Sequence, residues 1–226
     1  MKACCNEVAA LFAGAWFATS GATVDAAPCL IVTLAGTHGG PQQPFNGLAS
    51  AGTLVRYGDD ADNCAAVKLQ FDAGRGTTMR LSQLGIGTEQ LNAVFFTHMH
   101  NDHTDGFADL VQSRWALHGT GPKIDAICSA DVTSPQGVVL SCRKFVAHMA
   151  DAFIQSGEIA QRHSEVAERT AGGPAELVNT LTFEPTDEPQ VVYPGGLRAD
   201  SGPSRTVIPT DRGQRSGDCG QFPMSV

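Results

Sequence analysis

The chain has 226 residues, of which 42% are hydrophobic and 17% are charged. This composition is typical of one folded globular domain and argues against an intrinsically disordered chain. The net charge of -8 at pH 7 disfavours nucleic acid as a partner, because such binding depends on Lys and Arg side chains that neutralise phosphates. We expect no membrane anchor, since the only apolar N-terminal stretch is too short and interrupted to span a bilayer.

The N-terminal segment has the order of features found in secretory signals. Lys2 is followed by an apolar stretch over residues 8–18 and then by small residues up to Ala26. This order predicts a signal peptide over residues 1–27 and a mature chain in the periplasm or outside the cell. An ordinary apolar helix is the alternative, because Glu7 interrupts the basic region.

Hydrophobic patterns predict the elements of the first half. We expect strands over residues 30–34, 52–57 and 65–71, of which the last two form a hairpin or meander around a polar turn. A short helix over 78–84 precedes a buried strand at 94–96. The pattern then predicts a helix over 106–117 and a strand over 123–130.

Three histidines and an aspartate lie within Thr97–His103, directly after the buried strand. Because strand side chains alternate, His98 and His100 project the same way just past its end and can hold one metal ion. Asp102 and His103 follow in the loop and can reach a second ion beside the first. A solvated polar turn, or core histidines held by hydrogen bonds, is the alternative.

The second half has one long helical pattern, over residues 142–168, with Gly157 as its weak point. Its apolar stripe, which we interpret as core packing, comprises Phe145, Met149, Ala152, Phe153, Ile159 and Ala160. Of the remaining histidines, His38 lies in a glycine-flanked loop that can reach the metal loop. His118, His148 and His163 are expected to be packed or on the surface.

Five of the seven cysteines lie outside the predicted signal peptide, and none forms a Cys-x-x-Cys pair. In an oxidising compartment Cys128 and Cys142, on either side of a turn-rich segment, can form a disulfide. Cys29 with Cys64 is the weaker second pairing. Buried free thiols are the alternative for all four.

These motifs carry a resemblance to a known family. His98-x-His100-x-Asp102-His103 resembles the metal-binding motif of the metallo-β-lactamase superfamily. Asp72-x-Gly74-x-Gly76-Thr77 and the segment 34–40 are similar to its ribonuclease Z and arylsulfatase-like branch, over about residues 29–130. The resemblance implies an α/β fold with mixed sheets, the αββα sandwich, present here mainly as its N-terminal half.

The resemblance also implies a chemistry and a site. His98 and His100 would bind a first zinc ion, Asp102 and His103 a second, and Asp102 would also be catalytic by orienting a metal-bound hydroxide. Asp72 would support the metal loop by hydrogen bonding, with a plain turn aspartate as the alternative. The implied reaction is hydrolysis of a small-molecule phosphodiester or sulfate ester; a lactonase or thiolesterase is the alternative, and a homodimer is left open.

The sequence departs from the family pattern in its second half. That half supplies further histidine ligands and a bridging aspartate in the family, yet no histidine follows His163. From residue 198 onward there is no periodicity, and only Asp218 is a weak candidate for the bridging aspartate. We therefore expect a domain over 28–197, an irregular tail over 198–226, and a truncated or frame-shifted member. A catalytically inactive metal-binding fragment is the alternative to an enzyme.

Overall fold

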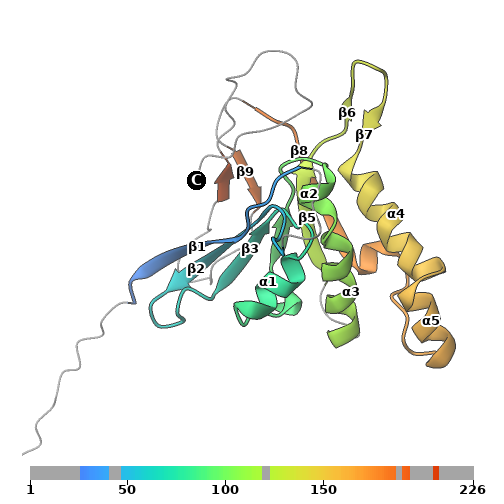
Figure 1. Ribbon diagram of the computed structural model, residues 1–226, viewed down its shortest axis with the longest axis horizontal. Helices are drawn as coiled ribbons and strands as arrows, with labels where there is room; N and C mark the ends of the chain where they lie inside the picture. Colours follow the sequence, from blue (N-terminus) through green and yellow to red (C-terminus); the bar gives the residue numbers. More distant parts are fainter. Residues whose placement is uncertain (1–25, 41–46, 119–122, 187–189, 194–205, 209–226) are drawn as a thin grey trace, which may run out of the picture.

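A computed structural model describes residues 26–40, 47–118, 123–186, 190–193 and 206–208 (Figure 1). Most of the predicted signal peptide, most of the predicted tail and Asp218 lie outside these ranges. No helix in the described ranges is both long and apolar enough to cross a membrane.

One mixed sheet of six strands, in the order β1-β2-β3-β4-β5-β8, forms the centre of the fold. The first three strands are antiparallel, as the predicted meander requires, and β3 to β8 are parallel to one another. The strands are β1 (Pro28–Gly36), β2 (Gly52–Asp59), β3 (Val67–Phe71), β4 (Ala93–Phe95), β5 (Ile124–Ser129) and β8 (Val178–Phe183).

Helices cover one face of this sheet (Figure 1). Parallel neighbours need a crossover connection, and the segments between β3, β4, β5 and β8 supply helices for that purpose. These are α1 (Thr77–Gln83), α3 (Phe107–His118), α4 (Cys142–Gln155) and α5 (Glu158–Glu165), with the short η2 (Thr88–Gln90), α2 (Asn101–Thr104) and η3 (Pro174–Glu176). The helical elements expected at 78–84 and 106–117 are thereby confirmed.

The main apolar core lies between the sheet and the helices and contains side chains from both. Fully buried Leu54, Val94 and Ile124 from the sheet meet Phe107 and Leu110 from α3. Phe96 packs edge-on against Phe107, with ring centroids 5.0 Å apart. This packing fixes the end of β4, from which the histidine loop departs.

The opposite face of the sheet carries a second apolar cluster. Phe95 stacks on Phe71 at 4.6 Å and meets Tyr193 edge-on at 6.0 Å. Tyr193 belongs to β9 (Gln190–Tyr193), which pairs with β10 (Thr206–Ile208). β10 lies within the tail expected to be irregular, where Thr206, Val207 and Ile208 are β-branched and suit a strand.

The long helix expected over 142–168 is interrupted in its middle, and its predicted apolar stripe is confirmed only in part, at buried Ile159 of α5. α4 ends at Gln155 and α5 begins at Glu158, because Gly157 has an extended, non-helical backbone. The buried residues of α4 are Cys142, Val146 and Ala150, whereas Phe145 is 37% exposed. Met149 and Phe153 pack against the core only in part. In α4 the buried stripe therefore lies about one position from where the sequence pattern placed it.

Both predicted disulfides are present. Cys29 is bonded to Cys64, and Cys128 is bonded to Cys142. The first joins β1 to the turn before β3, and the second joins the end of β5 to the start of α4. Between Cys128 and Cys142 the chain forms a two-stranded hairpin of β6 (Val132–Thr133) and β7 (Val139–Leu140).

Candidate metal centre

The histidine loop begins where β4 ends. The backbone N–H of Phe96 donates to the Ile127 carbonyl, 2.8 Å away on neighbouring β5, and the chain then leaves the sheet. Met99 turns inward and packs against the helix-side core, while His98 is half-buried and His100 is exposed. The alternation inferred from the sequence therefore continues past the strand and brings the two histidine rings to one side.

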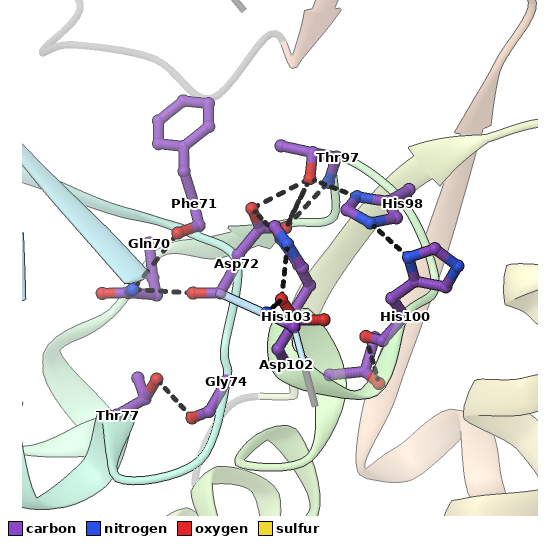
Figure 2. Close-up of polar contacts among 12 residues, drawn as sticks. Gln70, Phe71, Asp72, Gly74, Thr77, Thr97, His98, His100, Asp102 and His103 are labelled. Atoms are coloured by element: carbon purple, nitrogen blue, oxygen red, sulfur yellow. Dashed lines mark hydrogen bonds and ion pairs between the residues drawn. The ribbon is translucent and has the colours of Figure 1, made fainter. Parts of the chain in front are cut away.

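His98 and His100 form the first donor pair. Nε2 of His98 lies 3.0 Å from Nδ1 of His100, and the rings meet edge to face (Figure 2). Burial lowers the pKa of His98, and the nearby His103 and His100 lower it further. His98 is thus held in the neutral form that can donate a lone pair to a metal ion.

Asp102 and His103 form the second pair, in the single turn of α2 rather than in an irregular loop. Nε2 of His103 lies 3.4 Å from Oδ2 of Asp102. The same carboxylate oxygen accepts the backbone N–H of Gly40 at 2.7 Å. The ring of His103 lies 4.0 Å from that of His98, so the two pairs are neighbours.

Asp72 contacts His103 directly and reaches His98 through Thr97 (Figure 2). One of its carboxylate oxygens lies 2.8 Å from Nδ1 of His103, and the carboxylate also accepts the backbone N–H and the hydroxyl of Thr97. This is the supporting role that the resemblance implied. Its backbone has φ 57°, in the left-handed region, which is uncommon for a residue other than glycine.

The contact with Asp72 determines the direction in which the pKa of His103 is shifted. Burial alone would lower the pKa of His103, but the hydrogen bond to Asp72 and the charges of Asp72 and Asp102 outweigh it and raise this pKa. When Asp72 accepts from the Nδ1 proton, Nε2 keeps a lone pair that faces an Asp102 oxygen. The raised pKa means that this nitrogen binds a proton readily, and a metal ion at the same position would have to displace that proton.

Three contributors were not predicted as part of the site. Gln70 is fully buried in β3 and its side-chain amide donates to the Asp72 carbonyl at 2.7 Å, which secures the left-handed turn. Thr97 bridges Asp72 to both neighbouring histidines. Gly40 holds Asp102. Thr97 lies within the histidine cluster and Gly40 within the segment 34–40, whereas Gln70 follows the apolar–polar alternation of β3 and gave no local signal.

Two glycines allow the loops to close around this site. A methyl group at Gly74 would overlap the carbonyl oxygen of Asp102, and one at Gly106 would overlap the carbonyl of Gly74. The backbone N–H of Ala73 donates to the His103 carbonyl at 2.8 Å. The Asp72-x-Gly74 motif is therefore required by close backbone approach beneath the metal loop.

Within each pair, the donor atoms have the chemical types and the spacing expected of two ligands on one zinc ion. With zinc bonds of about 2.0–2.1 Å, tetrahedral ligands lie roughly 3.3 Å apart, close to the 3.0 Å and 3.4 Å of the two pairs. Within the described ranges, however, no group of three or more His, Cys, Asp or Glu side chains converges on one point. Among the described residues each pair therefore offers two candidate donors, and no third donor joins either pair.

The other three histidines whose side chains are described do not join these pairs. His38 pairs through its backbone with the Ala49–Ser50 segment, and its buried Nε2 has no hydrogen-bond partner. His148 and His163 are exposed on α4 and α5. The side chain of His118 lies outside the described part of the chain.

The chain is similar to known proteins over most of its length. A model of the family described as "Metallo-beta-lactamase superfamily" matches residues 66–196. Ribonuclease Z from Mycobacterium sp. (strain KMS) is 29% identical over 192 residues, which cover 80% of this chain and 60% of the relative. Ribonuclease Z from Mycolicibacterium gilvum (strain PYR-GCK) is 36% identical over 84 residues, which cover 37% of this chain and 26% of the relative.

Solved structures align with this chain over part of their length. The metallo-beta-lactamase fold protein YhfI from Bacillus subtilis has a TM-score of 0.44 and 18% identity, covering 73% of this chain and 50% of that one. Human tRNase Z, short form, has a TM-score of 0.41 and 19% identity, covering 69% and 45%. This chain spans about 60% of the length of the first ribonuclease Z relative.

Proposed function

Because this chain belongs to the metallo-beta-lactamase superfamily, we propose that it is a metal-dependent hydrolase that acts on phosphodiester bonds. One observation carries the proposal. Two donor pairs, His98 with His100 and Asp102 with His103, lie side by side at the carboxyl end of β4. The relatives named ribonuclease Z support a phosphodiester over the sulfate ester.

The residues of the site would act in distinct ways. His98 and His100 would hold one zinc ion, and Asp102 and His103 the other; bound zinc activates water and stabilises negative charge on the phosphate. Asp72 keeps the Nδ1 proton of His103 in place, so that Nε2 faces outward as a ligand. The Gly40 N–H fixes one oxygen of Asp102 and leaves the other free to orient an attacking water.

Metal stoichiometry together with turnover tests this function. Zinc-loaded protein would be measured by inductively coupled plasma mass spectrometry and assayed on bis(p-nitrophenyl) phosphate. We expect bound zinc and turnover in the unmodified protein. His100→Ala should lose both, whereas His148→Ala, at an exposed histidine on α4, should keep both.

Each remaining outcome has a definite meaning. Unchanged zinc content in His100→Ala would remove the proposed site. Zinc binding without turnover of any phosphodiester would support the alternative, a catalytically inactive metal-binding protein. Faster turnover of an aryl sulfate, lactone or thioester than of the phosphodiester would replace the proposed substrate class.

RNA is the second candidate substrate, favoured by the name of the relatives. The net charge of -8 counts against it, because affinity for RNA comes chiefly from cationic side chains. Cleavage of a precursor tRNA at a rate comparable to that of the small diester would make RNA the substrate.

We further propose that the protein works in an oxidising compartment, outside the cytoplasm. Two disulfides support this, because such bonds are rare in reducing compartments. Cell fractionation followed by N-terminal sequencing tests it. A mature chain beginning near Pro28 in the extracytoplasmic fraction is expected, and full-length protein in the cytoplasm would contradict it.

A further inference from the structure

Thr97 lies between the end of β4 and His98, and its hydroxyl group has several polar neighbours. Its Oγ1 lies 2.9 Å and 3.1 Å from the two carboxylate oxygens of Asp72 and 3.1 Å from Nδ1 of His98 (Figure 2). Nδ1 of His103 is a further neighbour, at 3.3 Å. A hydroxyl has one proton to donate and two lone pairs that accept, so these neighbours restrict one another.

The carboxylate of Asp72 takes the hydroxyl proton. An ionised carboxylate only accepts hydrogen bonds, so the hydroxyl must donate to the Asp72 oxygen that lies 2.9 Å away. The same carboxylate accepts the backbone N–H of Thr97 at 2.9 Å, and it lies 2.8 Å from Nδ1 of His103. Asp72 is buried, so water does not readily take the place of the hydroxyl. Oγ1 of Thr97 therefore has only lone pairs for His98.

This arrangement determines which nitrogen of His98 carries the proton. Two lone pairs 3.1 Å apart would repel, so Nδ1 of His98 must donate its proton to Oγ1 of Thr97. A neutral imidazole has a single N–H, which leaves a lone pair on the other nitrogen. That other nitrogen, Nε2, is the atom of His98 that lies 3.0 Å from Nδ1 of His100. The hydrogen bond at one nitrogen thus leaves the other ready to bind a metal ion.

We propose that Thr97 is a positioning residue whose hydroxyl connects Asp72 to His98 and thereby directs the Nε2 lone pair of His98 toward the first zinc ion. Asp72 orients His103 directly, and it orients His98 through this hydroxyl. One buried carboxylate therefore orients a candidate ligand in each donor pair. This inference rests on the proposed function, because the ligand that Thr97 orients belongs to the proposed zinc site.

The tautomer of His98 can be measured in metal-free protein by heteronuclear NMR of the imidazole nitrogens. A pH of about 8 lies above the ordinary histidine pKa of about 6.5, so the neutral form is observed. We expect a protonated Nδ1 and an unprotonated Nε2, with the signals assigned by their loss in His98→Gln. Thr97→Val keeps the β-branched shape and removes the hydroxyl. Both tautomers should then be populated, because nothing at Nδ1 fixes the proton.

Zinc affinity, measured by competition with a chelator, is the second readout. Thr97→Val should weaken zinc binding by about 10- to 100-fold, as expected when a contact that orients a ligand is lost. Thr97→Ser retains a hydroxyl and should recover the tautomer and most of the affinity. Thr104→Val is the matched control, because buried Thr104 lies in α2 and its hydroxyl donates to the backbone carbonyl of His100. It should keep the His98 tautomer and bind zinc more tightly than Thr97→Val.

The possible results separate this inference from the proposed function. A protonated Nε2 of His98 in the unmodified protein would overturn the role of Thr97, even if phosphodiesters are hydrolysed, and this result requires no variant to fold. An unchanged tautomer in Thr97→Val, or an equal loss of zinc affinity in Thr97→Ser or Thr104→Val, would overturn it as well. The expected tautomers and zinc affinities without turnover of any phosphodiester would support the role of Thr97 and overturn the hydrolase.

Discussion

Asp72 is the residue on which most contacts of the candidate metal centre converge. It holds His103, Thr97 and the backbone of the histidine loop, and its own carbonyl is held by Gln70. Its effect on metal binding should therefore operate through the orientation of His103.

Asp72→Asn should weaken zinc binding by about 10- to 100-fold, the usual effect of losing such a supporting contact. The amide would retain an acceptor for Thr97, but its NH₂ group cannot accept the Nδ1 proton of His103. Competition titration with a zinc chelator measures the affinity. Asp105→Asn is the control, because Asp105 lies on the same loop and its carboxylate pairs with the exposed side chain of Arg75; an equal loss there would contradict the role of Asp72.

The sequence predicted the grouping of the candidate donors better than their supports. The spacing of His98, His100, Asp102 and His103 was sufficient, because local backbone geometry brings them together. The bond from Gly40 to Asp102 joins residues 62 positions apart. No local pattern specifies such a contact, which depends on how β1 and β3 are placed by the sheet.

At the scale of elements, Gly157 separates two helices that the sequence pattern joined. A Cβ at this position would lie 2.9 Å from the Phe153 Cα and 3.0 Å from the Ala152 oxygen. Helix propensity alone would make Gly157→Ala stabilising by about 1 kcal/mol. Close backbone contact at the break opposes this effect.

Gly157→Ala should therefore lower the free energy of unfolding by about 1–3 kcal/mol, the usual cost of overpacking. Urea denaturation measures the change. Gly173→Ala is the control, since nothing lies within 4 Å of its added methyl group, and it should change stability by less than about 0.5 kcal/mol. A stabilised Gly157→Ala protein would favour one continuous helix.

The Cys128–Cys142 disulfide connects β5 to α4 across a sequence separation of 14 residues. Loss of a link that closes a loop of this size costs about 3 kcal/mol. Cys142→Ala should lower the free energy of unfolding by about this amount under non-reducing conditions. Equal stability of the variant, or reaction of Cys128 and Cys142 with a thiol reagent in unfolded wild-type protein, would contradict the bond.

Element types were predictable where hydrophobic periodicity was strong, as in the strands at 52–57 and 65–71. The position of the α4 stripe was not, because Phe145 and Val146 are adjacent and both apolar. Only packing against the sheet decides that Val146 is buried and Phe145 is exposed. The mixed sheet and its helical layer came from the resemblance rather than from periodicity.

At the scale of the whole molecule, Tyr193 joins the β9–β10 ribbon to the sheet. Burial raises the pKa of Tyr193 above its ordinary value of 10.0, and the neighbouring Asp125 raises it further. The unfolded chain thus loses this phenolic proton at lower pH than the folded protein. The resulting stability is present below pH 10 and is lost as pH rises through the folded pKa.

Urea denaturation at pH 9 and pH 11 tests this contribution. The unmodified protein should lose more stability across this interval than Tyr193→Phe, which has no proton to lose at that position. Equal losses in the two proteins would show that Tyr193 is not protected by the sheet and Asp125.

Most residues of the candidate metal centre lie close together along the chain, and this bears on the order of folding. Its supports and ligands lie around the β3–β4 pair, where Lys68 bonds to Asn92 across 24 residues. The β5–β8 pair instead joins Asp125 to Asn179 across 54 residues. Closing the longer loop costs about 0.7 kcal/mol more chain entropy, so the first pair has the lower barrier to nucleation. An ion captured by the nascent β3–β4 pair would then act as a folding nucleus, and zinc would accelerate refolding as well as stabilise the finished protein.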